Sequence, residues 1–189
     1  GQAAFYGFGA YLSSWLSTHH RVPPAVGLVV ATLVPAAVAY VLGRPILRLR
    51  GYYLAMVTAG IGLIAHTVFV EWESVTGGNA GIHIKTPDVF GFRLDSDVSF
   101  YFACLIVSVF ATLAVLNLLR SPTGRAFVAI RDSEVSAQSM GIHLARYKTL
   151  SFAISAALAG IGGALYAHKL QFISPDQFDI VQSIDLLLM

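Results

Sequence analysis

The chain has 189 residues, of which 56% are hydrophobic and only 12% are charged, with a formal net charge of +2. Soluble domains carry about 25% charged residues, so this composition excludes an ordinary water-soluble globule and favours a protein whose solvent is lipid. The single cysteine, Cys104, excludes a disulfide framework, and we expect neither a bound metal nor a nucleic-acid partner.

Long runs without Asp, Glu, Lys or Arg recur along the chain, and each predicts a helix. They are Ala3–Thr18, which is slightly short, and then Ala25–Gly43, Gly51–Val70, Phe100–Leu119 and Thr149–His168. A bilayer core about 30 Å thick needs roughly 20 helical residues to cross it. A sixth run begins near Ser183 and is cut off at Met189. We therefore predict an all-α, polytopic transmembrane bundle with about five spans plus a truncated sixth, forming one domain over residues 1–189 that is an internal fragment of a larger protein.

The loops between these runs divide the charges unequally. Loops 43–50 and 120–148 together hold eight basic and two acidic residues, whereas the remaining segments hold four basic and eight acidic residues. Because Lys and Arg concentrate in cytoplasmic loops, these two loops are predicted to be cytoplasmic. Residues 71–99 then form an external loop.

Small residues predict close helix packing in three of the spans. In the last span they follow one another at i+4 spacing in two rows, Ser155, Ala159, Gly163, Ala167 and Ala156, Gly160, Ala164. Such rows let helix backbones approach closely in lipid, so this helix is expected inside the bundle. Gly60 and Gly62 would act similarly in the third span, and Gly7 and Gly9 in the first.

A few polar residues and one proline lie within the predicted spans. His66 is an ionisable group at membrane depth, so it is either a functional residue or a neutral histidine that donates to a carbonyl. Pro35 is expected to interrupt its helix, with or without a functional role. Thr58, Thr67 and Ser155 are candidates for the lining of a translocation path.

The basic loop 120–148 contains a predicted amphipathic helix. Ser121–Gly124 is a turn cluster that ends the preceding helix, and Gly141 is expected to end the amphipathic helix. Its apolar residues are Phe127, Ile130, Val135 and Met140. A solvated connector, a helix on the lipid surface and a docking helix are all compatible with this pattern. We favour docking, because charges of both signs beside a narrow apolar stripe suit a protein groove.

A glycine-rich stretch in the external loop is a second candidate site. It comprises Thr76, Gly77, Gly78, Asn79 and Gly81. Glycines allow backbone conformations that other residues avoid. The stretch is therefore either an ordinary turn or part of an external gate or binding-protein contact.

No catalytic motif is present: the chain lacks His-Glu-x-x-His, Gly-x-Ser-x-Gly and Walker A patterns. We therefore do not expect an enzyme, and any ATP would have to be hydrolysed by other chains. An ion-coupled secondary transporter stays open as an alternative, since His66 resembles the ionisable groups of such carriers.

Several motifs resemble, in the right order, those of branched-chain amino-acid ABC transporter permeases of the LivM type. The resemblance covers essentially the whole chain, from Gln2–Tyr11 through Leu49–Thr58 and Thr76–Ile82 to Ser151–Ala167. In loop 120–148 it implies a segment that couples to the ATPases, with candidate residues Gly124, Arg125, Ala129, Ile130, Arg131, Ala137 and Gly141. Of the general Glu-Ala-Ala…Gly coupling pattern, only Ala137 and Gly141 are present.

The resemblance also implies partners and a location. These are a second permease subunit in a heterodimer, two cytoplasmic ATPase subunits that bind ATP and Mg, and a periplasmic substrate-binding protein, in a bacterial inner membrane. This chain itself would bind no cofactor. Leucine, isoleucine and valine are the implied substrates, with urea or short-chain amides as the alternative within the same family.

Overall fold

Helices make up most of the chain in the computed structural model, which describes residues 2–19, 24–47, 49, 52–78, 81–83, 88–89, 92–93 and 97–178. The five long helices among these residues are α1 (Gln2–His19), α2 (Pro24–Ile46), α3 (Tyr52–Glu71), α5 (Asp97–Arg120) and α8 (Leu144–Leu170). The shorter helical elements are α4 (Glu73–Thr76), α6 (Pro122–Asp132), α7 (Glu134–Ser139) and the 3₁₀ turn η2 (Pro175–Phe178). The strands are β1 (Ile82–His83), β2 (Asp88–Val89), β3 (Phe92–Arg93) and β4 (Phe172–Ile173).

The predicted all-α transmembrane bundle is confirmed. Within the described residues, α2, α3, α5 and α8 are each long and apolar enough to cross a membrane. The helix of the slightly short first run, α1, has 18 residues. Helices dominate because lipid offers no hydrogen-bond partners, so each backbone amide must be paired within its own segment. The sixth run predicted from Ser183 lies outside the described residues.

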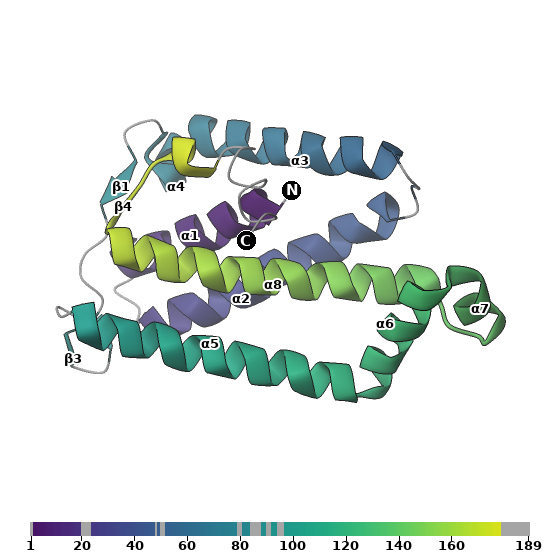
Figure 1. Cartoon of the computed structure of the whole chain (residues 1–189). Helices are drawn as coiled ribbons and strands as arrows, with labels where there is room; N and C mark the ends of the chain where they lie inside the picture. The colour runs from purple at the N-terminus through teal and green to yellow at the C-terminus, as the bar shows by residue number, and fades with distance from the viewer. Residues whose placement is uncertain are drawn as a thin grey trace.

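The long helices run side by side, and the two basic loops meet at one end of the bundle (Figure 1). The end of α2 and the segment formed by α6 and α7 lie on the right-hand side of that view. Helix α4 and the strands β1 and β4 lie at the opposite end. This arrangement is the one that the alternating charge of the loops predicts.

The core of the bundle is α8, which packs against both α1 and α2. A Cβ atom on Gly160 would overlap the carbonyl oxygen of Ala31 in α2. On the neighbouring face of α8, a Cβ atom on Gly163 would overlap the carbonyl oxygen of Tyr6 in α1. A Cβ atom on Gly9 would likewise meet the backbone of Gly160. The three backbones therefore touch directly, which only glycine permits at these positions.

Pro35 of α2 is fully buried in this contact. Its Cγ atom is 3.0 Å from the position that a Cβ of Gly160 would occupy. The same face of α2 carries the buried Ala31 and Ala39. Pro35 thus packs against α8, and the structure gives it a place in the helix interface.

Among the described residues, no neighbouring helix packs closely against Gly60 or Gly62, where close packing was expected. Open space surrounds the Cβ position of both residues, with no atom within 4 Å. In Figure 1, α3 lies at the border of the bundle. Small residues permit a close approach, but a neighbouring helix must be present to make it.

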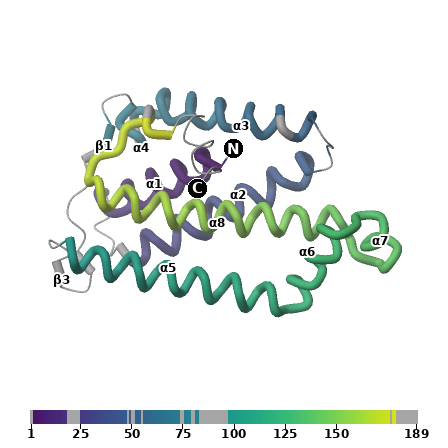
Figure 2. The backbone as a smooth tube through the Cα atoms, in the orientation of Figure 1, coloured from purple at the N-terminus to yellow at the C-terminus, as the bar shows by residue number. Residues whose placement is uncertain are grey.

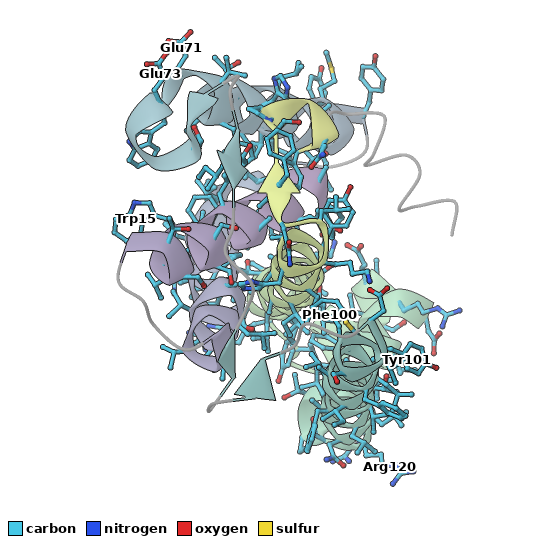
Figure 3. All side chains as sticks on the ribbon, turned by 90° about the vertical axis from the view of Figure 1, so that its left-hand side faces the viewer. Trp15, Glu71, Glu73, Phe100, Tyr101 and Arg120 are labelled. Carbon is cyan, nitrogen blue, oxygen red and sulfur yellow. The ribbon has the colours of Figure 1, made fainter. Side chains whose placement is uncertain are left out.

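The most exposed long helix is α5, none of whose described residues is buried. At one end it continues through Ser121 into α6. At the other end the carboxylate of Asp97 pairs with the ammonium group of Lys169 on α8 at 2.5 Å, and this ammonium lies 5.6 Å from the ring centroid of Phe100. Figure 3 shows Phe100 on the side of α5 near α8 and Tyr101 directed away from the bundle. The bundle therefore holds α5 mainly by its two ends.

Candidate functional site

The basic loop forms two helices, so the prediction of a single amphipathic helix is wrong. Ser133 lies between α6 and α7 with extended backbone angles (φ −159°, ψ 114°). Its hydroxyl accepts a hydrogen bond from the backbone N–H of Ser136 at 3.2 Å, which is the usual role of serine at a helix start. The predicted turn at Ser121–Gly124 is also shorter than expected, because only Ser121 separates α5 from α6, and Pro122 already opens α6.

This break divides the apolar stripe between two environments. Phe127 of α6 packs edge-to-face on Tyr147 of α8, with ring centroids 6.1 Å apart. Val135 of α7 and Met140 just after it are 80% and 79% exposed. Figure 2 shows α7 beyond the end of the long helices. The most exposed apolar side chains of this loop are therefore those of α7 and its following turn.

Two contacts fasten α7, one to α8 and one to the turn before it. The ammonium group of Lys148 pairs with a carboxylate oxygen of Glu134 at 2.6 Å, and the backbone N–H of Ile142 donates to the carbonyl of Ala137 at 3.0 Å. Ala137 is 1% exposed. Gly141 adopts φ +83°, a left-handed conformation that favours glycine after a helix. A short, closed turn thus joins α7 to α8.

The remaining candidate coupling residues lie along α6. Gly124 is buried at the elbow, where a Cβ atom would overlap the backbone of Leu119. Ala129 and Ile130 are partly buried, whereas Arg125 and Arg131 are exposed. Of these candidate coupling residues, Gly124 therefore lies at the elbow between α5 and α6, whereas the two arginines are exposed.

The described residues of the glycine-rich stretch form a compact turn around Thr76. Thr76 is 2% exposed, and its hydroxyl lies 2.7 Å from the carbonyl oxygen of Phe69 and 2.8 Å from that of Trp72. The same oxygen accepts from the backbone N–H of Gly78 at 3.2 Å. Thr76 therefore satisfies the backbone groups where α3 ends. Asn79 lies outside the described residues.

The glycines of this stretch join the external loop to the segment after α8. Gly77, Gly78 and Gly81 have φ values of 70°, 56° and 70°. A Cβ atom on Gly81 would overlap the carbonyl oxygen of Ile173. The strands β1 and β4 then pair antiparallel, with Ile82 opposite Ile173. In Figure 3, which views this end of the bundle, Glu71 and Glu73 project outward beside the turn.

An aromatic cluster lies beneath this turn. The ring of Phe178 in η2 packs on Tyr6 and Tyr11 of α1 and on Phe69 of α3, with centroid distances of 5.9, 5.5 and 6.3 Å. A Cβ atom on Gly7 would meet Phe69 at 2.8 Å and Phe178 at 3.0 Å. This aromatic layer thus ties η2 to the first half of α1 and to the end of α3.

The three candidate path-lining residues do not come together. Thr58 and Thr67 are nine residues apart on α3, which places them on opposite sides of a helix with 3.6 residues per turn. Thr67 is exposed, and its hydroxyl donates to the carbonyl of Leu63 at 3.1 Å. Ser155 lies on α8, where its hydroxyl accepts from the side-chain amide of Gln2 at 2.9 Å. The described residues thus do not bring all three side chains onto one face.

A buried polar pair that the sequence did not single out joins α1 to α8. Nε2 of His168 lies 2.9 Å from the hydroxyl oxygen of Ser13, and both residues are buried. His66, the histidine that the sequence places within a predicted span, is only partly buried. Within the described ranges, no group of three His, Cys, Asp or Glu side chains is placed to hold a metal ion.

Loss of the Thr76 hydroxyl is expected to destabilise the outer turn. In Thr76→Val, the N–H of Gly78 loses its acceptor in a buried setting, which costs about 1–3 kcal/mol. Thermal unfolding of the full-length protein in detergent measures this cost. Thr67→Val removes a similar hydroxyl from an exposed helix face and is expected to change little. Equal effects of the two substitutions would contradict the buried role of Thr76.

Comparison with known proteins gives one consistent result. The sequence model of the family described as "Branched-chain amino acid transport system / permease component" matches residues 1–189. The chain is 34% identical to the high-affinity branched-chain amino acid transport system permease protein LivM of Salmonella typhimurium and to that of Escherichia coli, over 97% of this chain and 49% of each relative. It is 26% identical to the probable branched-chain amino acid transport permease protein LivM of Methanocaldococcus jannaschii, over 83% of this chain and 48% of the relative. No solved structure matches significantly.

The chain spans about half the length of the curated relatives that it matches. The family match nevertheless covers every residue of the chain, and its apolar helices make it a multi-pass membrane protein. The resemblance seen in the motifs is thereby confirmed. This chain belongs to the family of permease components of branched-chain amino acid transport systems.

Proposed function

We propose that the full-length protein is the membrane-spanning permease subunit of an ATP-driven importer of branched-chain amino acids in a bacterial inner membrane. The names of the LivM relatives support the substrate class. In this proposal a second permease subunit completes the translocation path, and a periplasmic binding protein delivers the substrate. Two cytoplasmic ATPase subunits bind ATP and Mg and supply the energy.

The observation that carries the coupling part of the proposal is the exposed apolar surface of α7. Val135 and Met140 are the most exposed of the large apolar side chains in the described residues, and they lie beyond the ends of the long helices. An apolar pair of this kind suits a groove on a partner protein. In our proposal α7 docks into the ATPase, and Arg125 and Arg131 of α6 contribute charged contacts at the rim.

The movement would pass from α7 to the core of the bundle. The Lys148–Glu134 ion pair and the Ile142–Ala137 hydrogen bond link α7 to α8. Since the backbone of α8 touches those of α1 and α2 through Gly160 and Gly163, tilting α8 requires these helices to follow. This chain of contacts supports an alternating-access mechanism driven from the cytoplasmic side.

The outer turn is our candidate for contact with the binding protein or for an external gate. Its described members Thr76, Gly77, Gly78 and Gly81 join α3 to the segment after α8. Glu71 and Glu73 are exposed beside it. A shape change in the bundle would thus alter the surface offered to a docked protein.

Uptake by reconstituted vesicles tests the proposal against its rivals. With the full-length protein and its partner chains in proteoliposomes, labelled leucine is expected to accumulate only when ATP reaches the ATPases. Collapse of the proton and sodium gradients should leave this uptake unchanged. Gradient-driven uptake without ATP would instead identify a secondary transporter. Uptake that urea or acetamide inhibits more strongly than isoleucine or valine would move the substrate class within the family.

A further inference from the structure

A basic hollow lies where the end of α2 meets the turn between α7 and α8. It has a volume of about 870 Å³, and its lining includes Arg44, His143 and Arg146. An adjoining hollow of about 400 Å³ shares Tyr40, His143 and Arg146 with it. None of the described residues that line either hollow is Asp or Glu. The charge of this region therefore favours an anion.

Within the described part of the chain, neither arginine is neutralised by a carboxylate. A guanidinium nitrogen of Arg44 donates to the hydroxyl of Tyr40 at 3.1 Å, and its central carbon lies 4.7 Å from the centroid of that ring. This contact leaves the charge of Arg44 in place and holds it beside the hollow. Arg146 lines the same hollow from α8 and is exposed. Two guanidinium groups thus flank one space, a geometry suited to phosphate oxygens.

The start of α8 adds donors to the same space. Its N-cap residue, His143, makes no side-chain capping hydrogen bond. The N–H groups of Arg146 and Tyr147 both donate to the carbonyl of His143. Leu144 and Ala145 line the hollow, and as the first two helical residues they have no partner for their N–H groups within the helix. The positive end of a 27-residue helix therefore reinforces the arginines.

An exposed apolar strip on α2 leads along the helix to Arg44. Val29, Leu33 and Val41 are 52%, 62% and 66% exposed, and helical spacing places them on the same side of α2 as Arg44. The opposite side, with Ala31 and Ala39, is buried against α8 and α1. A free anion would contact only the hollow. A phospholipid would contact both the hollow and the strip, with its headgroup at the arginines and its acyl chains along the strip.

We infer that this hollow binds the phosphate headgroup of an anionic phospholipid, whose acyl chains lie along the exposed side of α2. Basic pockets between membrane helices on the cytoplasmic side are suited to such headgroups. The site is independent of the transported substrate and of ATP. Its bound lipid would fasten the end of α2 to the turn that carries α7.

Lipid binding to the full-length protein in its complex tests this inference. Phosphatidylglycerol is titrated into the detergent-solubilised complex, with phosphatidylcholine as the neutral reference, and bound lipid is measured by native mass spectrometry. Arg44→Gln and Arg146→Gln are each expected to weaken phosphatidylglycerol binding roughly fivefold, the effect of one basic residue near a lipid surface. Arg120→Gln removes a charge from the exposed end of α5, outside both hollows, and is expected to leave binding unchanged.

Two further arms separate a lipid from a free anion. Leu33→Ser should weaken phosphatidylglycerol binding by disrupting the strip, and inorganic phosphate at millimolar concentration should fail to displace the lipid. Displacement by phosphate with no effect of Leu33→Ser would overturn the lipid assignment. An equal loss in Arg120→Gln would show general surface attraction and would overturn the site itself. Equal affinity for phosphatidylcholine would have the same consequence.

Discussion

Replacement of Gly160 by valine is expected to be strongly destabilising. The new Cβ atom would overlap the carbonyl oxygen of Ala31 and meet the ring of Pro35. Overpacking a well-packed interior costs about 1–3 kcal/mol when side chains can shift. Here the obstacle is backbone, so the cost is expected at or above the upper end of that range. Thermal unfolding of the full-length complex in detergent, together with its yield after purification, measures this effect.

Gly60 provides the matched control for this substitution. It lies in a membrane-spanning helix like Gly160, yet its Cβ position faces open space. Gly60→Val is therefore expected to be tolerated. A variant Gly160→Val as stable as the wild type would disprove the direct contact of α8 with α2. Severe loss in Gly60→Val would instead reveal a neighbour of α3 from another part of the protein or from its partner subunit.

Loss of coupling is the second large effect that we expect. Val135→Asp combined with Met140→Asp places two charges on the exposed apolar surface of α7. Buried apolar anchors at protein interfaces each contribute about 2 kcal/mol or more, so ATP hydrolysis stimulated by the binding protein and its substrate should fall at least about tenfold. Stimulated ATPase activity of the reconstituted complex and co-purification of the ATPases are the two measurements.

Val128→Asp on α6 is the control for the docking surface. Val128 is 52% exposed and receives the same change of side chain in the same loop, but it lies outside α7. It is expected to keep both stimulation and co-purification. Undiminished stimulation in the α7 double variant would refute the assignment of α7 as the docking element, whereas equal loss in Val128→Asp would place the docking surface on both helices.

The positions of the long helices were predictable because the bilayer imposes them. A run without charged residues that is long enough to cross the lipid must form a helix, since its backbone has no other hydrogen-bond partners there. The predicted run Phe100–Leu119 corresponds to α5 at Asp97–Arg120, and Ala25–Gly43 corresponds to α2 at Pro24–Ile46. The charged ends outside each run are included because a helix continues until a cap or a turn stops it.

The internal structure of the basic loop could not be predicted in the same way. Ser133 is compatible with a helix interior and with a helix cap, and its sequence neighbours do not decide between them. The break at Ser133 accompanies the packing of Phe127 on Tyr147 and the ion pair between Glu134 and Lys148. These contacts join residues that are 14 and 20 positions apart in the sequence. An analysis of helical periodicity detects only residues three or four positions apart, so it could not predict them.

The sequence by itself determined the class of the protein, the number and course of its long helices, the common end of its basic loops and its family. Those properties depend on composition and local order, which lipid and backbone hydrogen bonding convert directly into helices. Tertiary structure alone decided that Gly160 touches a neighbouring backbone while Gly60 does not, that His168 meets Ser13, and that Arg44 and Arg146 flank one hollow. Each of these contacts depends on which helix packs against which. The sequence of one helix does not by itself identify the helix that packs against it.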